Sequence, residues 1–201
     1  MNVNQRRIYN PNIHHRRSLR WHKHDYASAG AYYVTICVEG FQCLFGNVSA
    51  GVMNLNEAGR MVDSQWRSIP ARFPTMGLDE CAVMPNHFHG ILHITGAPYA
   101  GDPKGVGTRP AATLGDAIGS FKSLTTDRYI IGVRQLGWPR FERRVWERNY
   151  YEHVIRDPVE LEKIRQYIRT NPLMWTDDRY NSESGVLVVD DTGELMPWEQ
   201  T

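Results

Sequence analysis

The chain has 201 residues, of which 41% are hydrophobic and 22% are charged, and its formal net charge is +1. These values are ordinary for a soluble globular protein, and the length fits one domain with appendages. No apolar run approaches the roughly 18 residues that a membrane span needs, so we expect no membrane partner. Three cysteines without metal-type spacing, together with a polar and basic N-terminus that lacks a signal-peptide core, favour a cytoplasmic protein.

The small net charge conceals an asymmetry between the two ends. Residues 1–25 carry six Lys or Arg side chains against one acid, whereas residues 176–201 carry seven acids against one arginine. The basic end predicts a polyanionic partner, with a solvated tail as the alternative; the acidic end is either solubilising surface or a competitor of nucleic acid. The expected organisation is a basic arm (1–25), a central domain (26–175) and an acidic tail (176–201), with Arg16, Arg17 and Arg20 as candidate DNA contacts in the arm.

Strand and helix patterns alternate along the first half of the chain. β-branched and aromatic runs predict strands, and apolar residues at helical spacing after an asparagine predict a capped helix. The expected elements are a strand at 31–38, a short hairpin partner at 43–45, a helix from Asn54 or Asn56 to about 68, a strand at 78–84 and an antiparallel strand at 87–95.

Two histidines flank one large apolar residue at the start of the last of these strands. Side chains alternate faces along a strand, so Phe88 would point into the core while His87 and His89 share the opposite, outward face. Their Cα atoms would lie about 6.6 Å apart at a rise of about 3.3 Å per residue, which lets both imidazoles bind one metal ion. The spacing alone also fits two half-exposed strand histidines.

The second half of the chain predicts two helices and one strand. The expected elements are a Gly/Pro-rich loop at 96–110, a helix at 113–130, a strand at 141–151 and a helix from Asp157 to about 170. The whole order is strand–helix–strand–strand–helix–strand–helix, without an internal repeat. It predicts a ferredoxin-like α+β fold, in which helices pack on one face of an antiparallel sheet.

Two basic stretches in this half are candidate DNA contacts. Lys122 stands with short hydroxyl side chains on the polar side of a predicted helix, which suits phosphate contact as well as an ordinary solvated face. Arg143, Arg144 and Arg148 alternate with aromatic residues in the last predicted strand. That mixture offers charge for phosphates and rings for base stacking.

The last predicted helix places Tyr167 and Asn171 four residues apart, so that one lies above the other. A tyrosine is a candidate nucleophile, and an asparagine carbonyl oxygen is a suitable ligand for a hard divalent cation. Each residue by itself also has a structural explanation, as a boundary residue or as a helix end. Tyr150 and Tyr151 are the alternative nucleophiles, but only Tyr167 has a metal-capable group one turn away.

Several blocks together resemble the single-tyrosine transposases that carry a His-hydrophobic-His (HUH) motif, in the branch associated with repetitive extragenic palindromes (REPs). The resemblance covers roughly residues 14–175 and implies a ferredoxin-like fold. It also implies that His87, His89 and Asn171 bind the metal and that Tyr167 is the nucleophile. The blocks are MPNHFH at 84–89, RRSLR at 16–20, YVT at 33–35, FKS at 121–123, WERNYY at 146–151 and YIRTNP at 167–172.

This resemblance implies a metal-dependent single-strand DNA endonuclease and strand transferase. It would act on single-stranded or palindromic hairpin DNA through a 5′-phosphotyrosine, with Mg²⁺ or Mn²⁺ as cofactor; Zn²⁺ fits the mixed ligands less well. One rival is a catalytically silent hairpin-binding protein on the same fold. A second is a small-molecule metal hydrolase, which leaves the basic arm and the arginine-rich strand without a role. Both a monomer and a homodimer are compatible with the sequence.

Overall fold

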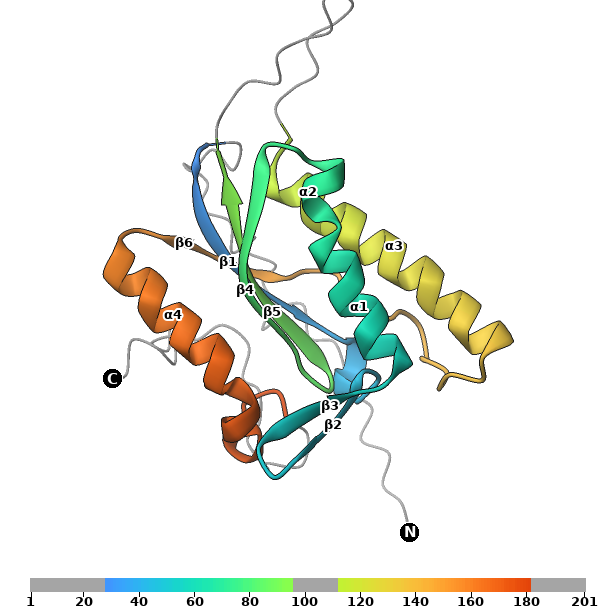
Figure 1. Ribbon diagram of the computed structural model, residues 1–201. Coiled ribbons are helices and arrows are strands. Elements are labelled where there is room, and N and C mark those ends of the chain that lie inside the picture. The colour runs from blue at the N-terminus through green and yellow to red at the C-terminus, as the bar shows by residue number, and fades with distance from the viewer. Residues whose placement is uncertain (1–27, 96–111, 182–201) are drawn as a thin grey trace, which may run out of the picture.

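The computed structural model describes residues 28–95 and 112–181, and every structural statement below refers to these residues. The fold is built around one four-stranded sheet with the strand order β4-β5-β1-β6 (Figure 1). All neighbouring strands in it are antiparallel, as expected. The strands are β1 (Gly30–Cys37), β4 (Met76–Val83), β5 (His87–Ile94) and β6 (Tyr151–Ile155).

Each of the three long helices begins at a side chain that accepts hydrogen bonds from its first turn. Asn56 caps the first, Thr113 the second and Asp157 the last. No helix in the described part of the chain is long and apolar enough to cross a membrane. The helices are α1 (Glu57–Arg67), α2 (Ile69–Arg72), α3 (Leu114–Gln135) and α4 (Pro158–Thr170), with short 3-10 turns η1 (Glu39–Phe41) and η2 (Asn171–Asp177).

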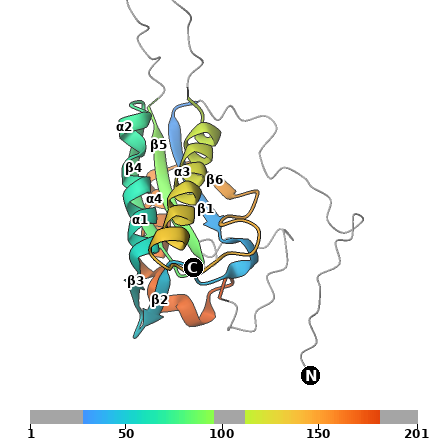
Figure 2. The same cartoon turned by 90° about the vertical axis from the view of Figure 1, so that its right-hand side faces the viewer.

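Helices cover both faces of the sheet. Figures 1 and 2 show α1 and α3 on one side and α4 on the other. The ferredoxin-like α+β fold is confirmed, and α1 and α3 share one face as expected, whereas α4 packs on the opposite face. The reason is that the central strands are apolar on both sides: Tyr32 and Tyr33 are both buried, in opposite clusters.

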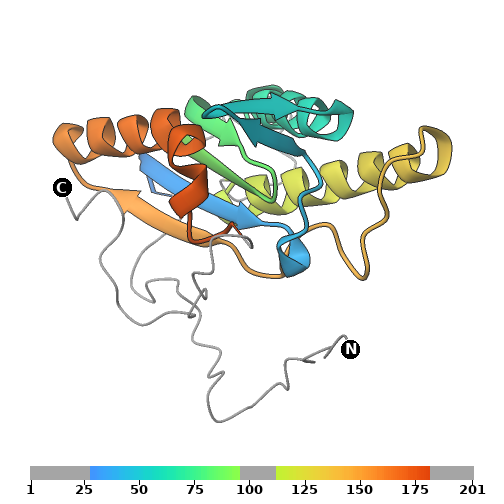
Figure 3. The same ribbon diagram turned by 90° about the horizontal axis from the view of Figure 1, so that it is seen from below.

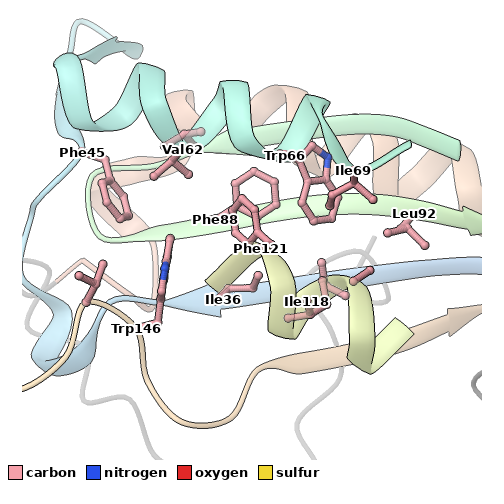
Figure 4. Packing of buried hydrophobic residues seen from close by; sticks show 14 of the residues in the cluster. Ile36, Phe45, Val62, Trp66, Ile69, Phe88, Leu92, Ile118, Phe121 and Trp146 are labelled. Carbon is pink, nitrogen blue, oxygen red and sulfur yellow. The ribbon is translucent and has the colours of Figure 1, made fainter. Parts of the chain in front are cut away.

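The larger core lies between the sheet and the α1–α3 layer (Figure 4). Phe88 contacts Trp66 and Phe121 there, with ring centroids 4.6 and 5.3 Å away. Gly90 permits this packing, because a Cβ at its position would lie 2.6 Å from the Trp66 ring. Burial of each such side chain contributes about 1.5–3 kcal/mol. The core therefore holds one face of β5 firmly inward.

A smaller core and an ion-pair network join α4 to the opposite face. The apolar members of this core are Tyr33, Ile91, Ile155, Ile164 and Ile168. At its edge, the Arg165 guanidinium donates to both carboxylate oxygens of Asp79, at 3.0 and 2.6 Å. His93 contacts the same carboxylate at 3.0 Å. These contacts set the position of α4 relative to β4.

The predicted hairpin partner at 43–45 is wrong. The hairpin that forms instead is a separate two-stranded sheet of β2 (Gly46–Ser49) and β3 (Val52–Leu55). Leu44 and Phe45 are consecutive and both buried, so this stretch does not alternate as a half-buried strand does.

The predicted strand at 141–151 is also wrong over most of its length. Only an isolated bridge between Val38 and Trp146 precedes β6, which starts at Tyr151. Val145 and Trp146 are neighbours in sequence and both are buried in the main core. An irregular backbone can bury two adjacent side chains in the same core, whereas a regular strand would turn them to opposite faces of the sheet.

We expect Asp79→Asn to lower the free energy of unfolding by about 1–2 kcal/mol at pH 7, because it removes a carboxylate with charged partners. The hydrogen bonds from Arg165 and from His93 hold the pKa of Asp79 well below its usual range. The stabilisation is therefore complete above the ordinary carboxyl pKa of about 3.9 and is lost as the pH falls below it. Urea unfolding should show a difference in the free energy of unfolding between wild type and variant, and this difference should become smaller toward pH 3.

Asp63→Asn is the matched control, because Asp63 forms its ion pair with the exposed Arg67 one turn away and otherwise accepts a long hydrogen bond, 4.0 Å, from the Cys81 thiol. That variant should lose less than about 0.5 kcal/mol. Two results would contradict the role given to Asp79: equal losses of unfolding free energy in the two variants, or a difference between wild type and Asp79→Asn that does not become smaller in acid.

Candidate functional site

His87 and His89 lie side by side on the face of β5 that α4 covers. Their Nε2 atoms are 3.0 Å apart, and both side chains are fully buried. The two histidines therefore share one face, as the strand alternation predicts. They do not point outward into solvent, because other parts of the chain cover them.

The second nitrogen of each ring is hydrogen-bonded within the protein. His87 Nδ1 lies 2.9 Å from Asn86 Oδ1. His89 Nδ1 lies 2.7 Å from Tyr33 Oη and 2.9 Å from Thr35 Oγ1, and both of these partners come from β1. Such contacts orient a histidine ring and leave its Nε2 for a metal ion.

Burial keeps both imidazoles neutral at physiological pH. It lowers the pKa of His87 to about 3, with a smaller opposing effect of Asn171. It also moves the pKa of His89 well below its usual range, and His87 and Arg179 add to that shift. A neutral imidazole has a free lone pair, so both rings are in the protonation state that binds metal.

The last helix brings Tyr167 to the histidine pair. The Tyr167 ring centroid lies 5.4 Å from that of His89 and 6.4 Å from that of Tyr33. Burial raises the pKa of the Tyr167 hydroxyl, and the charge of Asp178 raises it further. The phenol is therefore protonated at neutral pH and must lose its proton when it acts as a nucleophile.

Asn171 and Asp178 complete a group of donors around the histidines. Ligand atoms of His87, His89 and Asp178 all lie within 4.8 Å of one another. Asn171 Nδ2 donates to Asp178 Oδ2 at 3.3 Å, and Asn171 Oδ1 is buried without a hydrogen-bond partner in the described residues. A buried carbonyl oxygen without a partner is costly unless something else binds it.

These donors fit a divalent metal ion. Two neutral imidazoles, one carboxylate and one amide oxygen form a mixed nitrogen and oxygen set. Such a set suits Mg²⁺ or Mn²⁺ with further positions open, or a less selective transition metal. A cation there would also satisfy the unpartnered oxygen of Asn171.

The segment from Trp175 to Asn181, which we call the strap, covers the histidine pair. It includes the last residues of η2, which continues from α4 and turns toward the sheet in Figure 3. The Tyr180 ring centroid lies 4.8 Å from that of His87, and the Trp175 ring centroid lies 6.1 Å from it. The start of the sequence that we assigned to the acidic tail is thus part of the folded site.

The candidate DNA contacts have different surroundings. Lys122 is half-buried, and its ammonium donates to the carbonyls of residues 147, 148 and 149 at 2.6, 2.9 and 3.5 Å. Arg143 and Arg144 lie 3.9 and 3.8 Å from the carboxylate of Glu39, and Arg148 is exposed. The remaining candidates, Arg16, Arg17 and Arg20, lie outside the described residues.

The two alternative nucleophiles occupy different layers. Tyr151 is on the side of the histidines, with its ring 6.4 Å from Tyr33. Tyr150 packs against the main core on the other side of the sheet. Tyr151 is therefore the alternative that remains near the site.

Sequence reasoning missed four residues of this site. Asp178 lies in a stretch that composition alone marks as an acidic tail. Tyr33 and Thr35 have the right alternation for one strand face, but the register that sets them against His89 is a tertiary feature. Asn86 lies in the block MPNHFH, directly before the first histidine, but no sequence pattern assigned it a role of its own.

The chain matches no family model. A Haemophilus influenzae protein, described only as an uncharacterized protein, is 36% identical over 190 residues, which cover 85% of this chain and 96% of that protein. Among solved structures, a REP-associated tyrosine transposase bound to a REP hairpin superposes with a TM-score of 0.50 at 14% identity, over 75% of this chain and 71% of that one. The chain thus belongs to the family of the Haemophilus influenzae protein and has the fold of the REP-associated tyrosine transposase.

Proposed function

We propose that the protein is a metal-dependent single-strand DNA endonuclease and strand transferase that acts on palindromic hairpin DNA. The observation that carries the proposal is the position of Tyr167, whose ring lies against His89 beside a set of metal-binding donors. A solved structure with this fold is described as a transposase bound to a REP hairpin, which supports the same class of substrate.

Tyr167 is the proposed nucleophile. Its Oη would attack the phosphorus of the scissile phosphodiester, and the bond from phosphorus to the 3′ oxygen would break. The phenol loses its proton and the leaving oxygen takes one up, so the products are a 3′-hydroxyl and a 5′-phosphotyrosine. Attack of another 3′-hydroxyl on the phosphotyrosine reverses the step and joins strands without an energy cofactor.

His87, His89 and Asn171 are the proposed metal ligands, and Asp178 is a further one that the structure adds to the set. A bound Mg²⁺ or Mn²⁺ would polarise the phosphate and screen its charge. Tyr33 and Thr35, on β1, hold the His89 ring in place through hydrogen bonds at its Nδ1. Because the strap covers the histidines, it has to move aside before a phosphodiester reaches them.

Basic residues outside the site are the proposed DNA contacts. Arg143, Arg144 and Arg148 lie on the segment whose Trp146 pairs with Val38, directly after the end of β1. Cys37, the last residue of β1, is paired with His87 in β5. This position suits arginines that follow the backbone of a strand entering the site. Lys122 would act indirectly, by holding the backbone of residues 147–149 in position. The basic arm, with Arg16, Arg17 and Arg20, would bind the hairpin stem.

Tyr167→Phe should abolish the covalent protein–DNA adduct. Hairpin affinity should stay within about threefold of wild type, because phosphate contacts dominate it. Incubation with a labelled hairpin oligonucleotide and Mn²⁺, followed by a denaturing gel, measures the adduct. Tyr151→Phe is the matched control and should keep the adduct.

An adduct that survives in Tyr167→Phe and disappears in Tyr151→Phe would move the nucleophile to Tyr151. Hairpin binding by the wild type with no adduct under any metal would favour the catalytically silent hairpin-binding protein instead.

Asp178→Asn should weaken Mn²⁺ binding by about tenfold, because ligand charge sets the affinity of oxygen-rich sites. Titration followed by electron paramagnetic resonance measures the free ion directly. Asp177→Asn is the control, since Asp177 is the exposed neighbour of Asp178. His89→Ala and chelation by EDTA should each abolish cleavage, and EDTA-resistant cleavage would exclude a catalytic metal.

Deletion of residues 1–25 should lower hairpin affinity and flatten its dependence on salt, because each lost phosphate contact reduces the slope by about 0.9. Replacing Arg16, Arg17 and Arg20 with glutamine should reproduce about half of the effect, since they are three of six cationic side chains. An unchanged slope in the deletion would exclude the arm as a DNA contact.

A further inference from the structure

Asn86 is a fully buried carboxamide with three hydrogen-bond partners. Its Nδ2 lies 2.6 Å from the carbonyl oxygen of Tyr180, in the strap, and 3.1 Å from that of Phe41, in η1. Its Oδ1 lies 2.9 Å from Nδ1 of His87. One side chain thus connects the histidine pair, the strap and the turn that follows β1.

These partners decide which way the amide points. A backbone carbonyl oxygen only accepts hydrogen bonds, so the group that faces both carbonyls has to be the NH₂ of Asn86. The oxygen of Asn86 then faces His87. Because that oxygen also only accepts, His87 Nδ1 has to carry the proton, and the lone pair of the neutral ring is on Nε2.

The tautomer of His87 in turn fixes that of His89. His87 Nε2 has a lone pair, and His89 Nε2 is 3.0 Å away. Two lone pairs at that distance repel, so in the metal-free protein His89 carries its proton on Nε2 and donates it to His87. His89 Nδ1 then accepts from the Tyr33 hydroxyl, to which the Thr35 hydroxyl donates at 2.9 Å.

We propose that Asn86 is a positioning residue that sets the proton of His87 on Nδ1 and thereby directs the whole hydrogen-bond chain from Thr35 to the strap. In this chain every donor points away from Thr35 and toward the two carbonyl oxygens, of Phe41 and Tyr180, on which the chain ends. His87 presents an Nε2 lone pair at all times, before any metal ion is bound.

The two histidines consequently differ in whether their tautomer has to change when a metal ion binds. His87 keeps the same tautomer with and without metal. His89 has to transfer its proton from Nε2 to Nδ1 before its Nε2 can bind a cation, and the hydroxyls of Tyr33 and Thr35 permit this because a hydroxyl both donates and accepts. The use of these lone pairs rests on the proposed function, whereas the direction of the chain does not.

The test is nitrogen-15 NMR of the histidine side chains in the full-length, metal-free protein. Long-range correlations between ring protons and ring nitrogens distinguish a protonated nitrogen from one with a lone pair. We expect wild-type His87 as the Nδ1–H tautomer and His89 as the Nε2–H tautomer. A proton on His87 Nε2, or on His89 Nδ1, in this sample would overturn the proposal.

Two asparagine variants then test the role of Asn86. Asn86→Ala should remove the fixed tautomer of His87, so that its ring nitrogens report a mixture, and should weaken Mn²⁺ binding by about 10- to 100-fold. Asn56→Ala is the matched control: the Asn56 carboxamide also donates to a backbone carbonyl and accepts one hydrogen bond, but it accepts from the Gly59 N–H, where it caps α1. It should keep both tautomers and bind Mn²⁺ as wild type does.

The outcomes separate this proposal from the proposed function. Tautomers as expected, with weakened Mn²⁺ binding in Asn86→Ala alone, support the role of Asn86 even if no DNA is cleaved. Equal loss of Mn²⁺ binding in the two variants, or an unchanged His87 tautomer in Asn86→Ala, overturns it even if the wild type proves to be a nuclease.

Discussion

The site depends on how Phe88 is anchored between two histidines. Its ring is packed against Trp66 and Phe121 in the main core, and a strand turns alternate side chains to opposite faces. His87 and His89 therefore both lie on the other face of the strand. Loss of that apolar contact would release the strand and the spacing of the imidazoles together.

A polar site can be buried on that second face because its groups bind one another. Tyr33 and Thr35 hydrogen-bond to His89, and Asn86 hydrogen-bonds to His87. The strap supplies the Tyr180 carbonyl and the Asp178 carboxylate. Burial of unpaired polar groups would cost several kcal/mol, so the network is a condition for this arrangement. The exception is the carbonyl oxygen of Asn171, and it lies where a cation would satisfy it.

The two layers divide the tasks of the fold. The core between the sheet and α1 and α3 is almost entirely apolar and holds the sheet, whereas α4 has a narrower apolar stripe and brings polar groups to the histidines. The Asp79–Arg165 contact fixes α4 near its middle, and η2 continues from its C-terminal end into the strap. The placement of Tyr167 thus follows from how α4 is held against the sheet.

Local pattern was sufficient for β1, β4, β5 and the three long helices. Alternation placed His87 and His89 on one face, helical spacing placed Tyr167 above Asn171, and the cap at Asp157 marked the start of α4. These features involve residues within about one turn or one strand, where backbone geometry alone relates the side chains. The same reasoning failed at 141–150, where burial of Val145 and Trp146 overrides the appearance of a strand.

Tertiary structure alone decided the rest. The sequence determined that two imidazoles share a face and that a phenol and a carboxamide lie one turn apart, because those relations are local. It could not place α4 on the second face of the sheet, bring Asp178 to the histidines, or set Asn86 between His87 and Tyr180. Those contacts join residues up to 94 positions apart, and they form only when strand register and the packing of both layers bring distant segments together.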